Sequence, residues 1–241
     1  MIPYRSVHFV GVLSPEMAGL AVYTAHSNVK VTASDDHHNQ LYESMLKQAG
    51  VIFYDTFDQA NIAKNSDLVV LSPYYDGRHI EAQTAVKMKI SVLEAVRFIK
   101  DISQGVKRVV ILGDYEAPII AAWLAHVWNI GHLPVHALTN AVLGDANPVR
   151  SPGEADWFIL SLDGFKRDGT TYEANFLSID ADEVIIPSVL YDYPELNTTL
   201  DDVYQSYYTF VKRLPRHGLI IGNSDWSRMK RLRSHLADRF G

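Results

Sequence analysis

The sequence predicts an α/β fold built on parallel β-sheets. Short, almost continuously apolar segments alternate with segments whose apolar residues recur at helical spacing. Strands that are buried on both faces have this composition, and the helices between them cover both faces of the sheet. Two of the apolar segments have a glycine at or next to their C-terminal end, Gly11 and Gly113. A predicted helix follows each, and such strand–loop–helix junctions are where open parallel sheets hold ligands.

The first half of the chain is expected to form a Rossmann-like domain over residues 1–103. Its first helix is predicted to begin at Pro15 with Ser14 as the N-cap, because proline is favoured at the first helical position and serine at the cap. The expected strands are 7–12, 29–32, 51–53 and 68–72, and the expected helices are 15–23, 40–49, 80–87 and 92–103.

The second half is expected to form another α/β domain over residues 104–241, after a polar boundary segment at 101–107. A stretch rich in Gly, Pro, Asn and Asp at 139–154 predicts a surface loop. Residues 200–213 predict an amphipathic helix, since their apolar side chains recur every three or four positions. The other expected strands are 108–113, 156–162, 183–186 and 218–223, and the other expected helices are 117–130 and 226–239.

Composition excludes several classes of protein. The 241 residues carry a formal net charge of −6, which argues against nucleic-acid binding because phosphate affinity needs clustered Lys and Arg. The chain has no cysteine, so disulfides, thiolate metal sites and thiol nucleophiles are excluded. No apolar run reaches the roughly 18 residues of a membrane span, and the N-terminus has no leader pattern. A cytoplasmic protein without a membrane partner is expected.

The junction after strand 108–113 has the scaffold of a phosphate loop without its chemistry. A P-loop needs glycines that let the backbone curl, a Lys for the phosphates and a Ser or Thr for Mg²⁺. The corresponding segment here is Gly113, Asp114, Tyr115, Glu116, Ala117 and Pro118. The sequence therefore predicts a degenerate ATP loop.

A second candidate site lies at the strand ends of the first domain. Gly11, Ser34, Asp35 and Ser72 each lie at or close to the C-terminal end of an expected strand, where open parallel sheets hold their ligands. Ser34 and Asp35 could contact such a ligand, or they could instead cap the next helix. The adjacent Asp-Asp-His-His run at 35–38 is expected to be a solvated loop and not a metal site, since neighbouring loop residues rarely converge on one ion.

The order of these motifs resembles that of the Mur ligases, the ATP-dependent enzymes that add amino acids to the UDP-linked sugar precursor of peptidoglycan. The similarity is strongest to the UDP-N-acetylmuramate–alanine ligases and the murein peptide ligases. That family opens with H-F-x-G-x-G-G-x-G-M-S-G-L-A, and the chain matches it at His8-Phe9-Val10-Gly11 and Met17-Ala18-Gly19-Leu20-Ala21. Further matches, in the family's order, are Ser34-Asp35, Leu71-Ser72-Pro73 with Glu81 downstream, Leu112-Gly113 and the closing segment 218–225.

The departures from the family are concentrated where its function lies. Leu13, Ser14 and Glu16 replace three of the four glycines of the first loop. In the G-T-H-G-K-T-T loop, the positions of the second Gly, the Lys and the Mg²⁺-binding Thr carry Glu116, Ala117 and Pro118. Of the family's acidic metal segments, isolated carboxylates remain at Asp163 and Asp192, so these are taken as vestigial and no metal site is expected.

The resemblance implies a Rossmann-like UDP-sugar-type domain followed by a truncated central ATPase-type domain, with the C-terminal ligase domain absent. In the first domain, Gly11, Ser34, Asp35 and Ser72 would line the UDP-sugar pocket, and Ser34 and Asp35 could contact the ribose or the uracil. We expect a catalytically inactive protein without catalytic residues or cofactors, which acts as a binding or regulatory module in peptidoglycan precursor synthesis or recycling. Its partner would be an active Mur ligase or a second copy. Two alternatives stay open: an ATP- and Mg²⁺-dependent acid–amino-acid ligase whose missing parts come from another polypeptide, and a UDP-sugar-binding protein.

Overall fold

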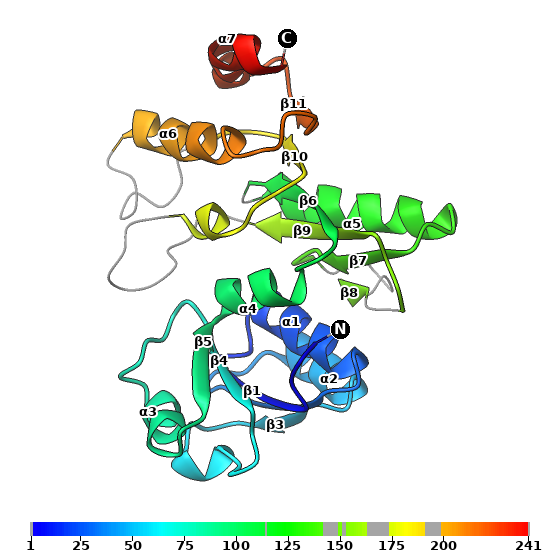
Figure 1. Cartoon of the computed structure of the whole chain (residues 1–241). Coiled ribbons are helices and arrows are strands. Elements are labelled where there is room, and N and C mark those ends of the chain that lie inside the picture. Colours follow the sequence, from blue (N-terminus) through cyan, green and yellow to red (C-terminus); the bar gives the residue numbers. More distant parts are fainter. Residues whose placement is uncertain are drawn as a thin grey trace. The chain divides into compact units, whose positions relative to one another are not determined.

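The computed structural model describes residues 2–113, 115–141, 149–150, 153–162, 174–190 and 199–240. The chain divides into two compact units, of which the first comprises mainly Met1–Gln104 and the second begins at Gly105. Each unit is built on its own β-sheet (Figure 1). All strand pairs whose register is described are parallel, so the predicted α/β class with parallel sheets is confirmed.

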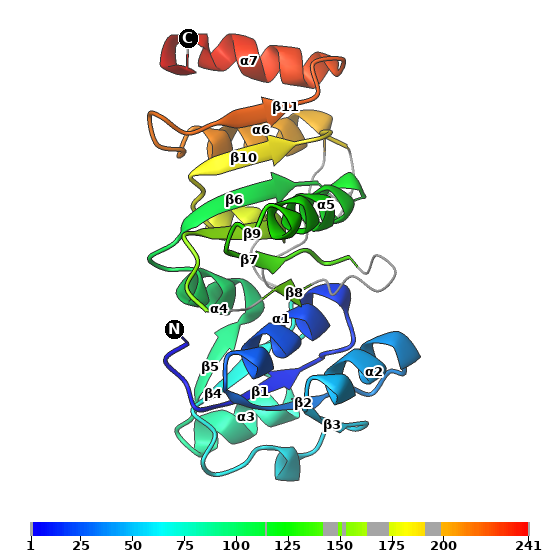
Figure 2. The same ribbon diagram turned by 90° about the vertical axis from the view of Figure 1, so that its right-hand side faces the viewer.

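The first unit has the strand order β3-β2-β1-β4-β5, in which the chain winds outward from β1 in both directions. Helices α1 and α2 cover one face of this sheet and α3 lies on the other (Figure 2). Its strands are β1 Ser6–Val10, β2 Lys30–Ser34, β3 Ile52–Tyr54, β4 Leu68–Leu71 and β5 Ser91–Glu94. Its helices are α1 Pro15–His26, α2 Gln40–Gln48, the short 3₁₀ helix η1 Gln59–Asn61, α3 Ile80–Lys87 and α4 Ala95–Ile102.

The core of the first unit follows from the composition of β1 and β4, which are buried along their whole length. Phe9 on β1 meets Phe98 on α4 edge to face, with the ring centroids 5.8 Å apart. Ser14 caps α1 as expected, since its side chain accepts a hydrogen bond from the Met17 amide. The predicted helix at 92–103 was wrong over its first residues, because 91–94 pair with β4 as strand β5 and the helix begins only at Ala95.

The second unit has the strand order β11-β10-β6-β9-β7-β8. Helix α5 covers one face of this sheet and α6 the other (Figures 1 and 2). The strands are β6 Lys107–Leu112, β7 Val135–Leu138, β8 Val149–Arg150, β9 Trp157–Leu162, β10 Glu183–Ile186 and β11 Ile220–Gly222. The helices are α5 Glu116–Ile130, the 3₁₀ helix η2 Asn175–Ser178, α6 Leu200–Val211 and α7 Ser227–Phe240.

Strand β7 has no counterpart in the prediction. It pairs with β9 from Val135 to Leu138 and is almost wholly buried. Four residues between a helix-ending Gly-Pro segment and a polar loop give too short a pattern to separate a strand from an extended connection. Strand β8 lies within the predicted loop at 139–154, of which 142–148 and 151–152 lie outside the described residues.

The C-terminal helix is attached through aromatic side chains of α6. The Tyr204 hydroxyl lies 2.9 Å from His235 Nδ1, and the Arg231 guanidinium lies 4.2 Å from the centroid of the Tyr204 ring. Arg231 also forms a 2.6 Å ion pair with Asp201 in the first turn of α6. Tyr204 and Tyr207 are buried, so these tyrosines belong to the core of the unit. Among the helices of the described residues, none is both long and apolar enough to cross a bilayer.

Candidate functional site

The sheet order of the first unit brings three of the predicted site residues to one edge. β1 lies between β2 and β4, so Gly11, Ser34 and Ser72 meet where these three strands end. The Gly11 amide donates to the Ser34 carbonyl at 2.9 Å, and the Ser72 amide donates to the Val10 carbonyl at 3.0 Å. A doubly wound sheet opens its ligand crevice at this switch point. The scaffold of a nucleotide-binding edge is therefore present.

An aromatic side chain covers the glycine at this edge. Gly11 has φ +72°, and a Cβ added there would lie 2.4 Å from Tyr75 Cε2. Tyr75 packs edge to face on Phe57 and His79, with centroid distances of 5.2 and 4.9 Å. Burial, followed by the nearby carboxylates of Asp36 and Asp35, raises the pKa of Tyr75 to about 12. A neutral phenol ring thus occupies the space beside the backbone that a glycine loop would offer to a phosphate.

The loop after β1 uses its own amides internally. Gly11 and Val12 both donate to the Ser34 carbonyl, at 2.9 and 3.2 Å. The next amide, Leu13, donates to Asp35 Oδ2 at 2.8 Å. Asp35 does not cap α2, because Asn39 fills that role by accepting from the amides of residues 41 and 42. The buried Asp35 carboxylate instead fixes the loop from within the protein.

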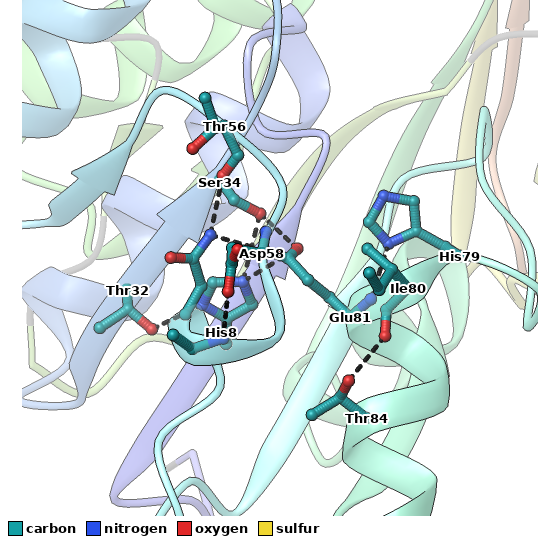
Figure 3. A network of polar contacts seen from close by, with 11 residues as sticks. His8, Thr32, Ser34, Thr56, Asp58, His79, Ile80, Glu81 and Thr84 are labelled. Atoms are coloured by element: carbon teal, nitrogen blue, oxygen red, sulfur yellow. Dashed lines mark hydrogen bonds and ion pairs between the residues drawn. The ribbon is translucent and has the colours of Figure 1, made fainter.

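A buried polar network lies beneath this edge and centres on Glu81 (Figure 3). Glu81 Oε2 accepts a hydrogen bond of 2.6 Å from the Ser34 hydroxyl and lies 3.4 Å from His8 Nε2. Its other oxygen, Oε1, accepts from Asn61 Nδ2 at 2.8 Å and from the Asp58 amide at 3.2 Å. Glu81 and His8 are fully buried, so one carboxylate joins β1, β2, η1 and α3.

The electrostatics of the network favour an ionised carboxylate. Burial by itself raises the pKa of Glu81, but the hydrogen bonds from His8, Ser34 and Asn61 outweigh it and lower the pKa below its ordinary value. His79 lies just before α3 and accepts a hydrogen bond from the Glu81 amide through Nδ1 at 3.3 Å. Burial lowers the pKa of His79, which keeps this nitrogen available as an acceptor.

The acidic run after β2 is held together by a histidine. The possible ligand atoms of Asp35, Asp36 and His37 lie within 4.8 Å of one another. His37 Nδ1 lies 3.0 Å from a carboxylate oxygen of each aspartate, and the hydrogen bond to Asp35 raises the pKa of His37. A histidine with a raised pKa between two carboxylates accounts for this arrangement as ion pairs.

The corresponding junction of the second unit also contains an internal carboxylate. Helix α5 begins at Glu116, and Glu116 Oε2 accepts a 2.9 Å hydrogen bond from the hydroxyl of Ser188, a buried residue that follows β10. Gly113 has φ +148°, and its amide donates to the Leu162 carbonyl at the end of β9. Ala117 is fully buried in the first turn. Pro118 is the third residue of α5 and has no backbone N–H, so the helix lacks one of the amide donors that could face an anion.

These residues do not fit a magnesium–nucleotide complex. The first turn of α5 offers a carboxylate and a proline where phosphate binding needs amide donors and a cation. Tyr115, which precedes the helix, is 70% exposed and makes no side-chain cap hydrogen bond. Asp114 and the two vestigial carboxylates, Asp163 and Asp192, lie outside the described residues.

Sequence reasoning missed three side chains that define these junctions. Glu81 was matched to a motif, but its role as the hub of a network depends on contacts with residues 20 to 73 positions away. Tyr75 carries no motif, and Ser188 begins the stretch aligned with one of the family's acidic metal segments, which does not indicate its contact with Glu116. A polar residue inside an apolar strand, His8 in β1, was the available signal that a buried partner must exist, since buried polar groups are hydrogen-bonded.

Each unit has a strand–loop–helix junction at the centre of a parallel sheet, and comparison with known proteins finds the same arrangement in the Mur ligases. Residues 6–107 match the Mur ligase family, catalytic domain. UDP-N-acetylmuramate–L-alanine ligase from Levilactobacillus brevis is 27% identical over 209 residues, which cover 87% of this chain and 44% of the relative. The same enzyme from Clostridium acetobutylicum is 25% identical, with 96% of this chain and 49% of the relative covered.

Solved structures agree on the fold. A UDP-N-acetylmuramate:L-alanyl-gamma-D-glutamyl-meso-diaminopimelate ligase from Neisseria meningitides superposes with a TM-score of 0.84 at 15% identity, covering 96% of this chain and 75% of that one. A UDP-N-acetylmuramate–alanine ligase from Thermotoga maritima gives a TM-score of 0.79 at 15% identity, and the match covers 94% of this chain and 51% of that one. The chain is similar to the Mur ligases in sequence and in fold, as the sequence resemblance predicted. It spans about half the length of the curated relatives it matches.

The packing of Tyr75 on Gly11 predicts the outcome of alanine substitutions. Gly50 has a similar φ of +76° but nothing within 4 Å of an added Cβ, so Gly50→Ala measures the cost of the backbone conformation alone, about 1 kcal/mol. Gly11→Ala adds the clash and should lower the free energy of unfolding by about 2–4 kcal/mol in urea titrations. Tyr75→Ala combined with Gly11→Ala should recover part of that loss. If Gly11→Ala and Gly50→Ala lowered the free energy of unfolding equally, the Tyr75 ring would not be packed firmly on Gly11.

The Glu81 network predicts a pH-dependent contribution to stability. Because the folded-state pKa of Glu81 is lowered, the stabilisation is present above its ordinary pKa and is lost as pH falls through the folded-state value. Glu81→Gln puts an amide donor against existing donors and should cost about 3 kcal/mol near neutral pH. Urea titrations between about pH 7 and 3 should show a flatter pH dependence for this variant. Glu43→Gln, which alters a partly exposed cap on α2, should cost below about 1 kcal/mol; a similar cost at Glu81 would refute the network's role.

Proposed function

We propose that this chain is a non-catalytic member of the Mur ligase family, a binding or regulatory module of peptidoglycan precursor synthesis or recycling. The observation that carries the proposal is the Glu116 carboxylate in the first turn of α5, where it accepts a hydrogen bond from Ser188. The N-terminus of a helix attracts negative charge, and here the protein supplies that charge itself.

Electrostatics oppose a triphosphate at this junction. Two like unit charges about 4 Å apart repel by roughly 1 kcal/mol in water and about 4 kcal/mol in a protein-like environment. The family pattern places a lysine one residue further on, where this chain has the buried Ala117. Repulsion from Glu116 and the loss of a lysine act in the same direction, so the affinity for ATP·Mg²⁺ falls by orders of magnitude.

The first unit supports the same interpretation for phosphate groups. The amides of Gly11 and Val12 donate hydrogen bonds to the Ser34 carbonyl, and the Leu13 amide donates one to the Asp35 carboxylate. A pyrophosphate would have to break these bonds and displace the Tyr75 ring before it could use the loop. The side chains of Ser34 and Asp35, which could contact a ribose or uracil, likewise have internal partners. A nucleotide sugar is therefore the less favoured ligand.

The link to the cell wall comes from the relatives. The curated relatives are named UDP-N-acetylmuramate–L-alanine ligases, and a chain that keeps their sheets while closing both junctions suits contact with an active ligase better than turnover. The alternative of a split ligase, completed by a second polypeptide, requires the same ATP loop to function. Nucleotide binding therefore discriminates between the two proposals.

Calorimetric titration with ATP·Mg²⁺ is the primary test. We expect no binding tighter than about 1 mM by the wild-type chain, because Glu116 repels the phosphates. The double substitution Glu116→Gly with Ala117→Lys removes the anion and restores the cation, and should tighten binding at least tenfold.

Asn129→Lys, which adds the same positive charge at the far end of α5, serves as the matched control and should leave the affinity unchanged. Micromolar binding of ATP·Mg²⁺ by the wild type, or phosphate release on adding UDP-N-acetylmuramate and L-alanine, would refute the proposal and favour the split ligase.

Titration with UDP-N-acetylmuramate tests the third interpretation. The internal bonds of the loop at 11–13 predict no measurable heat at millimolar ligand, and no protection of the loop amides in hydrogen exchange. Saturable binding that Gly11→Ala abolishes would instead establish a UDP-sugar-binding protein. The Gly50→Ala variant controls for a general loss of stability.

A further inference from the structure

Helix α5 leaves a row of large apolar side chains in water. Ile119, Trp123, Val127 and Ile130 are 48%, 60%, 55% and 64% exposed. We call these four residues the α5 stripe. They are three or four positions apart, so they lie on one face of the helix. Ala117 and Ala121, on the opposite face, are fully buried against the sheet.

The α5 stripe differs from an ordinary surface helix because the sequence around it carries no charged residue. Residues 117–144 contain no Asp, Glu, Lys or Arg, although charged residues make up 21% of the chain. The exposed or partly exposed positions beside the stripe are Ala122, His126 and Asn129. A solvent-facing helix surface carries charged or polar residues as a rule, and a contiguous apolar patch on a soluble protein marks a contact surface.

The order of the side chains indicates which partner fits. Read from either end, the α5 stripe begins and ends with an isoleucine and has Trp123 and Val127 between them. A two-fold axis across the helix near residue 125 would set Ile119 against Ile130 and Trp123 against Val127 of a second copy. An isologous interface needs this kind of self-complementarity. Ala122 lies beside the stripe, and its small side chain allows two helices to approach closely there.

The area is sufficient for a specific dimer. Four half-exposed large side chains, with Leu133 just beyond the helix at 53% exposure, offer on the order of 500 Å² per copy. Two copies would bury about 1,000 Å² in total, which is the lower limit for a specific interface. A membrane surface fits less well, because interfacial helices carry Lys and Arg beside their apolar face and α5 has neither.

From these observations we infer that the α5 stripe is a homodimer interface, in which two α5 helices pack antiparallel across a two-fold axis near residue 125. The inference depends on the exposed side chains of α5 and not on the proposed loss of catalysis. Dimerisation would cover the apolar surface, and residues 117–130, which carry no charged side chain, would bring no like charges together.

Sedimentation equilibrium of the full chain tests the assembly. We expect a reversible dimer with a dissociation constant in the micromolar range. Trp123→Glu should weaken it at least tenfold, because it places a charge at the centre of an apolar contact. Val86→Glu, which adds the same charge at an exposed apolar position of α3, is the matched control and should leave the dimer intact. The inference would be overturned if the wild type stayed monomeric at a concentration about 100-fold above the micromolar range. It would also be overturned by a dimer that Trp123→Glu does not weaken.

Cysteine cross-linking tests the geometry, because the chain has no cysteine of its own. His126 lies beside the proposed axis, so His126→Cys should give a disulfide-linked dimer on mild oxidation. Two copies of residue 119 would lie about 17 Å apart at 1.5 Å rise per residue, beyond disulfide reach. Ile119→Cys alone should therefore stay monomeric on denaturing gels, whereas a mixture with Ile130→Cys should cross-link. Equal cross-linking of the single variants at 119 and 126 would refute the antiparallel arrangement.

Discussion

Carboxylates of the chain itself constrain both strand–loop–helix junctions. In the first unit Asp35 holds the Leu13 amide, and Glu81 beneath it ties β1, β2 and α3 together through four contacts. In the second, Glu116 sits in the first turn of α5 and accepts from Ser188. Parallel sheets focus amide donors and helix dipoles at such junctions, so each is an anion site unless the protein fills it. Here an internal anion fills each one.

The two units differ in how firmly this constraint is built. Glu81 is fully buried and bonded to His8 and Ser34. Rearranging the first junction would therefore expose this buried network to water. Glu116 is exposed and has one described hydrogen-bond partner, so the second junction is closed mainly by charge and by the missing lysine. The first junction is thus held by packing, whereas the second depends on the contact of Glu116 with Ser188 and on the residue that stands in place of the lysine.

Much of this architecture could be predicted from the sequence, because buried strands and capped helices leave local signals. β1, α1, α3 and β10 follow directly from apolar runs, Ser14-Pro15 and helical spacing. β5 and β7 could not be assigned, since four residues do not separate a strand from a helix or a loop until a neighbouring strand pairs with them. The family could be recognised from ordered motifs. The partners Tyr75 and Ser188 could not, because long-range contacts with ordinary residues leave no local pattern.

The proposed closure of the second junction would also remove the role of α5 in binding a nucleotide. In a nucleotide-binding protein the first helix after the loop contributes its N-terminus to the ligand, and its stability is linked to ligand binding. In the described residues, α5 packs on β6, β7 and β9 through small residues such as Ala117 and Ala121. Its outer face carries exposed apolar side chains and no charge from Ile119 to Ile130, which costs solubility unless it is covered. If the proposed loss of nucleotide binding holds, selection on α5 acts on this outer face, which the proposed dimer would cover.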